Sequence, residues 1–344
     1  MSRSITLASS LGLDPRRFDG TPADRRLAKA VDAGLDRVEA ALDTELHYAH
    51  RIADAASRYL LEAGGKRVRP VLALLTAHLG RGVTEEVVRI AAAVEITHLA
   101  SLYHDDVMDE AVLRRGVPSA QVVYGNSSAI LTGDLLFARA SLIIADLGVE
   151  ALRLQGATFE RLVLGQLNET TGPDDGEDPI AHYLDVLADK TGSLIATAAE
   201  AGVRFSGADH AFIGPLREFG EKVGIAFQLA DDVLDLSADP AVTGKAAGTD
   251  LRAGVPTMPV LLLRSRSAEG DGTATGLLER LTGADDEAFA AAIAELREHE
   301  VTRETRDIAH RWATQAVAAL VPVPDGPVKR ALAEFAERVV ERES

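Results

Sequence analysis

The apolar residues of this chain recur every three to four positions, which is the spacing of one face of an α-helix. The clearest stripe lies in residues 23–61 and consists of Leu27, Val31, Leu35, Val38, Leu42 and Leu46. No segment shows the strict alternation of apolar and polar residues that a half-buried strand requires. Alanine and leucine, both good helix formers, dominate the composition, and aromatic residues make up only 4%. The pattern predicts an all-α fold of roughly a dozen helices around one core.

Local signals place the helices. Pro70 suits the first turn of a helix that ends before Gly80, and Thr84 is a predicted N-cap for a longer one. Residues 1–22 have no periodicity, so we expect a flexible tail followed by one helical domain over residues 23–344. Further helices are expected at residues 127–147, 150–170, 180–189, 192–203, 208–236 and 257–264, with loops at 113–118, 172–179 and 239–255.

The charge and composition narrow the classes of function. The formal net charge is −17, which disfavours binding to nucleic acid and to anionic membrane surfaces and favours binding to cations. The chain has no cysteine, so disulfides and thiolate metal sites are excluded, and a cytoplasmic location fits. No uninterrupted apolar stretch of about 20 residues occurs, so we expect no membrane span. Any contact with a membrane would be peripheral.

Two acidic triplets stand out against this background. The sequence DDVMD contains Asp105, Asp106 and Asp109, and DDVLD contains Asp231, Asp232 and Asp235; these two motifs are the chain's only internal echo. On a helix the first and last carboxylates of each triplet lie nearly above one another, with the middle one beside them. A single such motif is most often a solvated helix end. However, both triplets end strongly apolar runs, at residues 90–102 and 223–230, so the carboxylates are expected at the mouth of a buried core.

Three neighbouring carboxylates repel one another unless cations lie among them. Hard oxygen ligands, with no cysteine and few histidines, favour Mg²⁺. Mg²⁺ held by one or two carboxylates takes further oxygen ligands from water and phosphate. The triplets therefore indicate a magnesium-dependent protein that acts on a phosphorylated substrate.

Basic residues near the triplets support a phosphate site. They stand at expected loop positions: Lys66, Arg67 and Arg69 after a glycine pair, Arg114 and Arg115 after the first triplet, and Lys190 and Lys245 beside glycines. Each one alone could be a solvated surface residue. As a set they predict a basic wall that grips phosphate, with bidentate arginines and lysine point charges.

These motifs, in this order, resemble the all-trans isoprenyl diphosphate synthases, the polyprenyl synthetase family. The matching stretches cover about residues 60–260: GGKRVRP at 64–70, His98 with the first triplet, RRG at 114–116, GDLL at 133–136, KTGS at 190–193, QLADDVLD at 228–235 and GKAAGTDL at 244–251. The resemblance implies a helical bundle of the isoprenoid synthase type around a central apolar cavity. It also implies a homodimer and a Mg²⁺-dependent prenyltransferase that condenses isopentenyl diphosphate with an allylic diphosphate (geranyl, farnesyl or geranylgeranyl) and releases diphosphate.

The resemblance also assigns roles to residues. Asp105, Asp109 and Asp231 would bind three Mg²⁺ ions, assisted by Asp106, Asp232 and Asp235. The allylic diphosphate would be held by Arg114, Lys190 and Lys245, and isopentenyl diphosphate by Gly65, Lys66, Arg69, His98 and Arg115. Thr191 and Gln228 would line the allylic carbocation. The family usually has a lysine where this chain has Val255, which puts one allylic contact in doubt.

Product length is expected to depend on residues one helical turn before the first triplet. Ala100 and Ser101 are the fifth and fourth residues before Asp105, and both are small. Family members that make short products tend to have aromatic residues there, so small residues indicate an open tunnel and an all-trans product longer than C20. The alternative interpretation is that these small residues only allow close helix packing. In the open-tunnel interpretation, the floor of the tunnel would be set deeper, by Leu136, Phe137 or residues of the helix at 150–170.

Other functions remain open from the sequence. A geranylgeranyl or farnesyl diphosphate synthase would share every motif. A class I terpene cyclase shares the first triplet, but it does not need a second diphosphate site. A non-catalytic partner subunit usually has eroded triplets, and both are intact here. Glu95 and His98 form half of a di-iron bundle motif, for which the sequence offers no second half.

Overall fold

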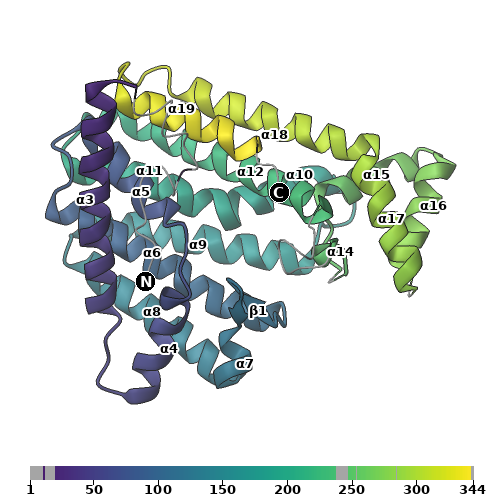
Figure 1. The fold of residues 1–344 in the computed structure, drawn as a ribbon, viewed down its shortest axis with the longest axis horizontal. Helices are drawn as coiled ribbons and strands as arrows, with labels where there is room; N and C mark the ends of the chain where they lie inside the picture. The colour runs from purple at the N-terminus through teal and green to yellow at the C-terminus, as the bar shows by residue number, and fades with distance from the viewer. Residues whose placement is uncertain (1–10, 12–19, 238–246, 253, 284, 342–344) are drawn as a thin grey trace. The chain divides into compact units, whose positions relative to one another are not determined.

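The computed structural model describes residue 11 and residues 20–237, 247–252, 254–283 and 285–341 (Figure 1). Within these ranges nearly all regular structure is helical, which confirms the predicted all-α fold. The exception is a two-stranded antiparallel ribbon, β1 (Leu113–Arg114) with β2 (Val117–Pro118). The contacts divide the chain into two compact units. The first consists of Met1–Arg161, Ser193–Gly220 and Ala319–Phe335, and the second of Leu162–Gly192, Glu221–Ala318 and Ala336–Ser344.

Helix α6 (Glu85–Met108) is the central element of unit 1, and it packs against helices on several sides (Figure 1). Its side chains are buried almost without interruption from Val87 to Ala100, as expected for a helix that is apolar all round. The Thr84 hydroxyl accepts a hydrogen bond from the Val87 N–H, which confirms the predicted N-cap. Its neighbours are α3 (Pro22–Glu45), α5 (Val68–Thr76), α7 (Ala120–Tyr124), α8 (Asn126–Ala145) and α11 (Ser193–Ser206).

The long apolar stripe predicted over residues 23–61 forms two helices in the structure. Helix α3 ends at Glu45 and α4 (Arg51–Glu62) begins after His50, whose imidazole accepts a hydrogen bond from the Ala53 N–H. The remaining short elements of unit 1 are η1 (Ala77–Leu79) and η3 (His210–Phe212).

The ribbon occupies the region predicted as a loop, and its turn explains the difference. Arg115 and Gly116 are its two central residues, and both have positive φ, 54° and 78°. A two-residue turn with two left-handed residues matches the twist of a hairpin, so even a very short pair of strands forms there. The turn fixes the backbone of Arg114 and Arg115, which come after the first triplet.

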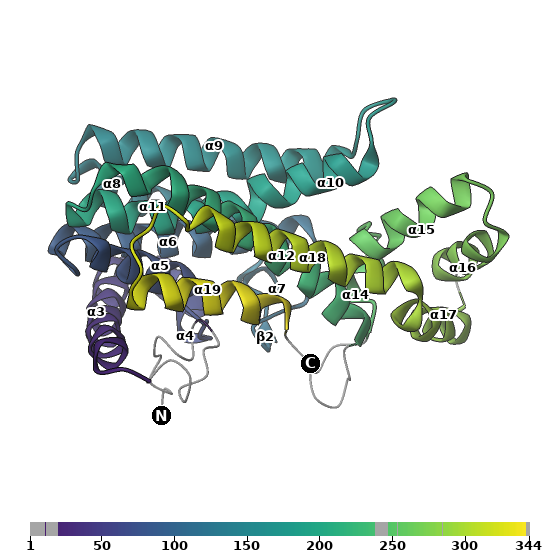
Figure 2. The same ribbon diagram turned by 90° about the horizontal axis from the view of Figure 1, so that it is seen from above.

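Unit 2 has its own apolar core, built around helices α15 (Met258–Ala268), α16 (Gly272–Thr282) and α17 (Asp286–Glu298) (Figure 2). Met258, Leu277 and Leu296 are fully buried there, and the partly buried Trp312 packs against this core. The other elements wholly in this unit are α10 (Pro179–Leu187), the π-helical turn η2 (Ala188–Gly192) and α14 (Thr249–Arg252). Helices α9 (Val149–Thr171), α12 (Ile213–Ser237), α18 (Glu300–Ala319) and α19 (Pro327–Val340) contribute residues to both units.

Helix α8 differs from the other helices in its apolar composition. By length and hydropathy it is the one helix, among the residues that the structure describes, that could cross a membrane, with a mean hydropathy of 1.6. Only 39% of the residues in that window are buried. It nevertheless packs along α6 within unit 1, and the core helix of a non-membrane protein meets the same criteria.

Candidate active site

The first triplet lies at the C-terminal end of α6, and Asp109 is the C-cap residue. Asp106 is 0% exposed, and its Oδ1 accepts a hydrogen bond of 2.7 Å from Nε of Arg114 in the ribbon. Its other oxygen, Oδ2, is buried without a hydrogen bond in the structure. Burial raises the pKa of Asp106, while the nearby Arg114 guanidinium opposes that shift. Asp106 thus has one carboxylate oxygen that accepts a hydrogen bond and one that is buried without a hydrogen bond.

The residues expected to hold isopentenyl diphosphate gather in unit 1. Arg69 Nε is buried and has no hydrogen-bond partner in the structure. Burial lowers the pKa of Arg69 to about 10; Glu95 opposes this shift, and the charge of Arg115 adds to it. Arg115 donates from Nη1 to the carbonyls of Leu60, at 2.7 Å, and of Gly64. Arg69 and Arg115 therefore lie close enough to repel each other, as expected of a site built for an anion.

His98 belongs to the same group. Burial lowers its pKa well below 6.5, and the charges of Arg69, Arg115, Arg114 and Arg67 lower it further. The imidazole is therefore neutral near pH 7, with one N–H that can donate a hydrogen bond to a phosphate oxygen.

Arg67 has a different environment from the other cations of this motif. It is 3% exposed and forms ion pairs with Glu39 and Glu95, at 2.6 and 3.2 Å. Because Glu95 is bound to an arginine, the di-iron interpretation of Glu95 and His98 has no support. Sequence reasoning counted Arg67 as one of the phosphate-gripping residues, and the structure shows it engaged by the protein instead.

Ala100 and Ser101 are buried on α6, one turn before the first triplet. A side chain at Gly133 on α8 would overlap the His104 ring and lie 3.2 Å from the Ala100 carbonyl oxygen. The absence of a side chain at Gly133 therefore allows α6 and α8 to approach closely here. That approach involves the carbonyl of Ala100, and it leaves the role of the two side chains in product length as a prediction.

Aromatic rings lie near this contact. The His104 ring is 5.6 Å from that of Phe137, whose ring is 4.4 Å from that of Phe159 on α9. His104 also lies 3.0 Å, through Nε2, from the Ile130 carbonyl oxygen. His104 on α6 thus packs against α8.

The second triplet lies in unit 2, on α12, which continues past it to Ser237. Asp232 is 5% exposed and accepts hydrogen bonds from the Tyr183 hydroxyl, at 2.9 and 3.0 Å, and from the Met258 N–H, at 3.0 Å. It therefore fastens α12 to α10 and to the start of α15. Asp231 and Asp235 are partly exposed on the same helix.

Lys190 and Thr191 lie in the π-helical turn η2, and Lys190 forms an ion pair with Glu169 on α9. A Cβ atom at Gly165 would lie 2.6 Å from the backbone nitrogen of Lys190, and one at Gly192 would lie 3.0 Å from the Glu221 carbonyl oxygen. These glycines let α9 and α12 pack tightly against the turn. Single π-helical turns are frequent at functional sites, and this one orients both residues that the sequence assigned.

The other assigned residues add less. Gln228 is partly buried on α12, and Gly65 and Lys66 are exposed in the loop before α5. Lys245 lies outside the described residues. Among the described residues, no three histidine or acidic side chains already converge in the arrangement that would hold a metal ion. The donors nevertheless suit a hard divalent cation, because they are carboxylate oxygens and Asp106 Oδ2 is buried without a hydrogen bond.

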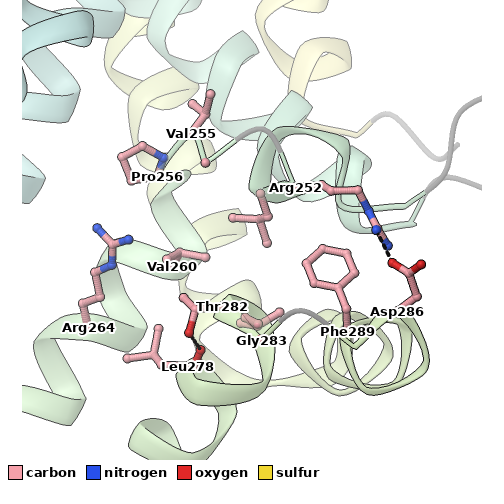
Figure 3. Close-up of a pocket in the computed structure, with 13 residues that line it drawn as sticks. Arg252, Val255, Pro256, Val260, Arg264, Leu278, Thr282, Gly283, Asp286 and Phe289 are labelled. Carbon is pink, nitrogen blue, oxygen red and sulfur yellow. Dashed lines mark hydrogen bonds and ion pairs between the residues drawn. The ribbon is translucent and has the colours of Figure 1, made fainter.

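Val255, which replaces the family lysine, lines a cavity of about 370 Å³ in unit 2 (Figure 3). Arg252 lies along this cavity, stacked on the Phe289 ring and paired with Asp286. None of the assigned site residues lines it. An apolar side chain thus stands at the sequence position where the family usually has a lysine.

Sequence reasoning missed the partners of its own candidates. Glu169 and Tyr183 contact assigned residues and belong to no recognised motif, whereas Glu95 was considered only as half of a di-iron motif and contacts Arg67 instead. Glu169 and Tyr183 are 21 and 49 residues from their partners in sequence, so no local spacing could reveal them. Glu95 offered one signal, a charged residue within an apolar helix.

Comparison with known proteins adds independent evidence. The sequence model described as polyprenyl synthetase matches residues 50–296. The chain is 42% identical over 320 residues to a nonaprenyl diphosphate synthase of Mycobacterium tuberculosis (strain ATCC 25618 / H37Rv), covering 93% of this chain and 95% of that protein.

Two crystal structures resemble the fold closely. A polyprenyl synthase from Caulobacter crescentus CB15, complexed with calcium and isoprenyl diphosphate, matches with a TM-score of 0.84 at 32% identity, over 100% of both chains. A geranylgeranyl pyrophosphate synthase from Corynebacterium glutamicum, complexed with the same two ligands, matches with a TM-score of 0.81 at 39% identity, over 94% of this chain and 98% of that one.

Proposed function

The chain belongs to the polyprenyl synthetase family and is a prenyltransferase, and from this premise we propose that it adds isopentenyl units to an allylic diphosphate to make an all-trans polyprenyl diphosphate longer than C20. The observation that carries the proposal is the group formed by Arg69, Arg115 and neutral His98. This group would bind one diphosphate, in addition to the diphosphate that metal ions at the two aspartate triplets would bind. A terpene cyclase, which binds a single diphosphate, has no need of it.

The metal used is proposed to be Mg²⁺, about three ions per active site. Asp105, Asp109 and Asp231 would hold the ions, with Asp106, Asp232 and Asp235 in support. Bound there, magnesium would neutralise the charge that builds on a departing diphosphate. Of the supporting residues, Asp106 has a buried oxygen without a hydrogen bond, whereas the carboxylate of Asp232 is engaged by Tyr183 and Met258. Asp106 is therefore the better placed of the two to contact a metal or its water.

The basic residues divide into two sets by substrate. Arg114, Lys190 and Lys245 would bind the allylic diphosphate, and Arg114 and Lys190 are paired with the acidic groups Asp106 and Glu169. Gly65, Lys66, Arg69, His98 and Arg115 would bind isopentenyl diphosphate. Arg69 offers its buried Nε, and His98 offers one N–H, so this second diphosphate is fixed by directed hydrogen bonds as well as by charge.

The residues of the chain would promote the reaction by positioning the two substrates and by stabilising charge electrostatically. The cations stabilise the leaving diphosphate as the allylic C–O bond ionises. The oxygens of Thr191 and Gln228 would face the resulting carbocation. The isopentenyl double bond, held at its own site, attacks the cation to form the new C–C bond, and the departed diphosphate takes the proton that is lost. Apolar walls keep water away from the cation.

A product longer than C20 is proposed from two observations. Ala100 and Ser101 are small and buried directly before the first triplet, where a growing chain would leave the metals. The similar Mycobacterium protein is named as a nonaprenyl diphosphate synthase. The alternative is a geranylgeranyl or farnesyl diphosphate synthase. It is supported by the similarity to the Corynebacterium enzyme, which is named as a geranylgeranyl pyrophosphate synthase.

A homodimer is proposed from the apolar surface of α7 and α8. Val122, Val123, Ile130, Leu131 and Leu142 are each at least 42% exposed on these two helices. An apolar surface of this kind is typical of an obligate interface, and a second copy would bury it. Peripheral contact with a membrane, to release the product, would compete for the same surface. A cytoplasmic location completes the proposal.

Purified protein tests the function directly. It is incubated alone with Mg²⁺, labelled isopentenyl diphosphate and farnesyl diphosphate, and the products are separated by chromatography. Linear products above C20 support the proposal. C20 or shorter products support the alternative synthase, cyclic hydrocarbons would show a terpene cyclase, and no product would indicate a non-catalytic partner subunit.

A further inference from the structure

We infer that Arg67 and Glu95 form a buried ion pair that positions the isopentenyl diphosphate site, with Arg67 anchoring the loop at residues 64–69 and Glu95 supplying the counter-charge beneath it. The inference deepens the proposed function and rests on it. Both residues act through others, so they are positioning residues rather than ligands of the substrate.

The hydrogen bonds of the Arg67 guanidinium go to other groups of the protein. Nε donates to Glu39 Oε1 at 2.6 Å, and Nη1 donates to Glu95 Oε1 at 3.2 Å. Nη1 and Nη2 also donate to the carbonyls of Gly64 and Leu61, each at 3.3 Å. With two carboxylates and two carbonyls around it, this group has a structural set of partners, in contrast to the buried Nε of Arg69.

The backbone of the loop is shaped around this side chain. Arg67 has φ of 54°, in the left-handed region that non-glycine residues seldom adopt, and its carbonyl accepts from the Val71 N–H as α5 begins. A Cβ atom at Gly65 would lie 2.6 Å from Arg67 Nη1 and 3.0 Å from the Arg115 guanidinium. The loop therefore rests on two guanidiniums, and the position of Arg67 determines where Lys66 and Arg69 lie on either side of it.

Glu95 has the opposite charge at the centre of this arrangement. It is 2% exposed on α6, one turn before His98. Its negative charge raises the pKa of Arg67 and partly offsets the lowering of the pKa of Arg69 and Arg115 by burial. One buried carboxylate thus serves three guanidiniums. Without it, their mutual repulsion would spread the group that is proposed to receive the diphosphate.

Only an arginine suits the anchor position. Its planar fork presents donors in fixed directions to both carboxylates and both carbonyls, whereas lysine has a single nitrogen on a flexible stem. Arg67 and Arg69 therefore have the same side chain, two positions apart, with different tasks: one holds the loop and the other faces the ligand.

The test separates the two substrates. We compare Glu95→Gln and Arg67→Lys with the unmodified protein by measuring KM for isopentenyl diphosphate, KM for farnesyl diphosphate and kcat. Displacing the loop should raise the isopentenyl KM by about tenfold to a hundredfold and leave the farnesyl KM within about twofold. Equal changes in both KM values, or no change in the isopentenyl KM of a folded variant, would overturn the inference.

A surface ion pair supplies the matched control. Arg37 and Glu85 lie 2.7 Å apart and are largely exposed, so Arg37→Lys and Glu85→Gln should leave all three kinetic constants unchanged. The double variant Arg67→Gln/Glu95→Gln should lose less than the sum of the losses of Arg67→Gln and Glu95→Gln measured singly, because it removes both buried charges together.

A milder variant covers the case in which the Glu95 variants do not fold. Glu39, the outer partner of Arg67, is 35% exposed, so Glu39→Gln should fold and raise the isopentenyl KM by a few-fold. Circular dichroism checks the fold of each variant. If the unmodified protein makes no product at all, the proposed function fails; the inference is then judged by calorimetry of isopentenyl diphosphate, and unaltered affinity in the Glu39→Gln variant would refute it.

Discussion

The two aspartate triplets have nearly the same sequence but different surroundings. The middle aspartate of each is buried, yet Asp106 is held by the charged guanidinium of Arg114, and Asp232 by the neutral donors of Tyr183 and Met258. The first triplet ends its helix at the C-cap, whereas the second lies inside α12. The same motif therefore gives a carboxylate balanced by a nearby cation in one unit and a structural fastener in the other.

The difference arises from the segment of chain that comes after each triplet. After the first, the charged partner of Asp106 is Arg114 of β1, only eight residues later. After the second, the backbone contact to Asp232 comes from Met258, 26 residues later. The nearby segment thus gives Asp106 a charged side chain as its partner, whereas the distant segment gives Asp232 the backbone N–H at the start of α15. If this distinction extends to function, variants of the two triplets should differ in defined ways.

The largest expected effect comes from the outer aspartates, where we predict that the two triplets are equivalent. Asp105→Ala and Asp231→Ala should each lower kcat by roughly 10³-fold, because each removes a proposed metal ligand worth several kcal/mol in the transition state. Steady-state kinetics at saturating Mg²⁺ measures the loss. Asp175→Ala, in an exposed loop, serves as control, and near-normal activity in either triplet variant would contradict the assignment.

The second prediction concerns the residues that precede the triplets. Ala100 and Ser101 stand before the first, whereas Ala226 and Phe227 stand at the corresponding positions before the second. Ser101→Phe should shorten the products by several isoprene units, because an aromatic ring would block the path behind the metals; chromatography of the products measures this. Ala100→Phe should act likewise, at an overpacking cost of about 1–3 kcal/mol.

An exposed serine gives the control for product length. Ser265→Phe, on α15, should leave the product distribution unchanged. If the Ser101 variant also gave unaltered lengths, the two small side chains would not set product length, and only the packing interpretation would remain.

The third prediction separates the two middle aspartates. Asp106→Asn should lower kcat by about tenfold to a hundredfold with little loss of stability, because burial already disfavours the charged form of Asp106. Asp232→Asn should instead lower the free energy of unfolding by about 1–3 kcal/mol, since a neutral amide oxygen accepts hydrogen bonds from Tyr183 and Met258 more weakly than a carboxylate does. Thermal unfolding and kinetics on both variants distinguish the cases. Identical profiles would erase the proposed difference between the triplets.

The smallest expected effect is a dependence of stability on pH that belongs to the first triplet's helix. His98 stands seven residues before Asp105, whereas Gly224 stands seven before Asp231. Because the pKa of His98 is lowered in the folded protein, its imidazole stays neutral as the pH falls through 6.5, while the unfolded chain takes up a proton. His98 should therefore cost about 1.4 kcal/mol of stability for each pH unit below 6.5, until its folded pKa is reached.

Urea unfolding at pH 7.5 and 5.5 measures this cost. The His98→Gln variant should lose less stability than the unmodified protein over that interval, because it has no imidazole to protonate. An equal loss in both proteins would show that His98 does not contribute.

Much of the fold could be predicted because helical periodicity and capping are local. The N-cap at Thr84 and the apolar run of α6 were both visible in the sequence. The break between α3 and α4 was not, since helical spacing of apolar residues was read as continuous over residues 23–61 and only the His50 cap marks the new start. The ribbon was missed for a similar reason: its two-residue strands are too short to show an alternation.

For the site, the sequence by itself determined which groups are present: two intact triplets, a glycine-flanked basic loop, and small residues at Ala100 and Ser101. Motif order alone carried this information, because catalytic residue types and their spacing are read directly from the chain. Only the tertiary structure decided which of these groups are engaged by other side chains of the protein. Arg67 and Arg69 are alike in sequence, but burial against Glu39 and Glu95 makes the first an anchor. Such partners come from distant parts of the chain, and only folding brings them together.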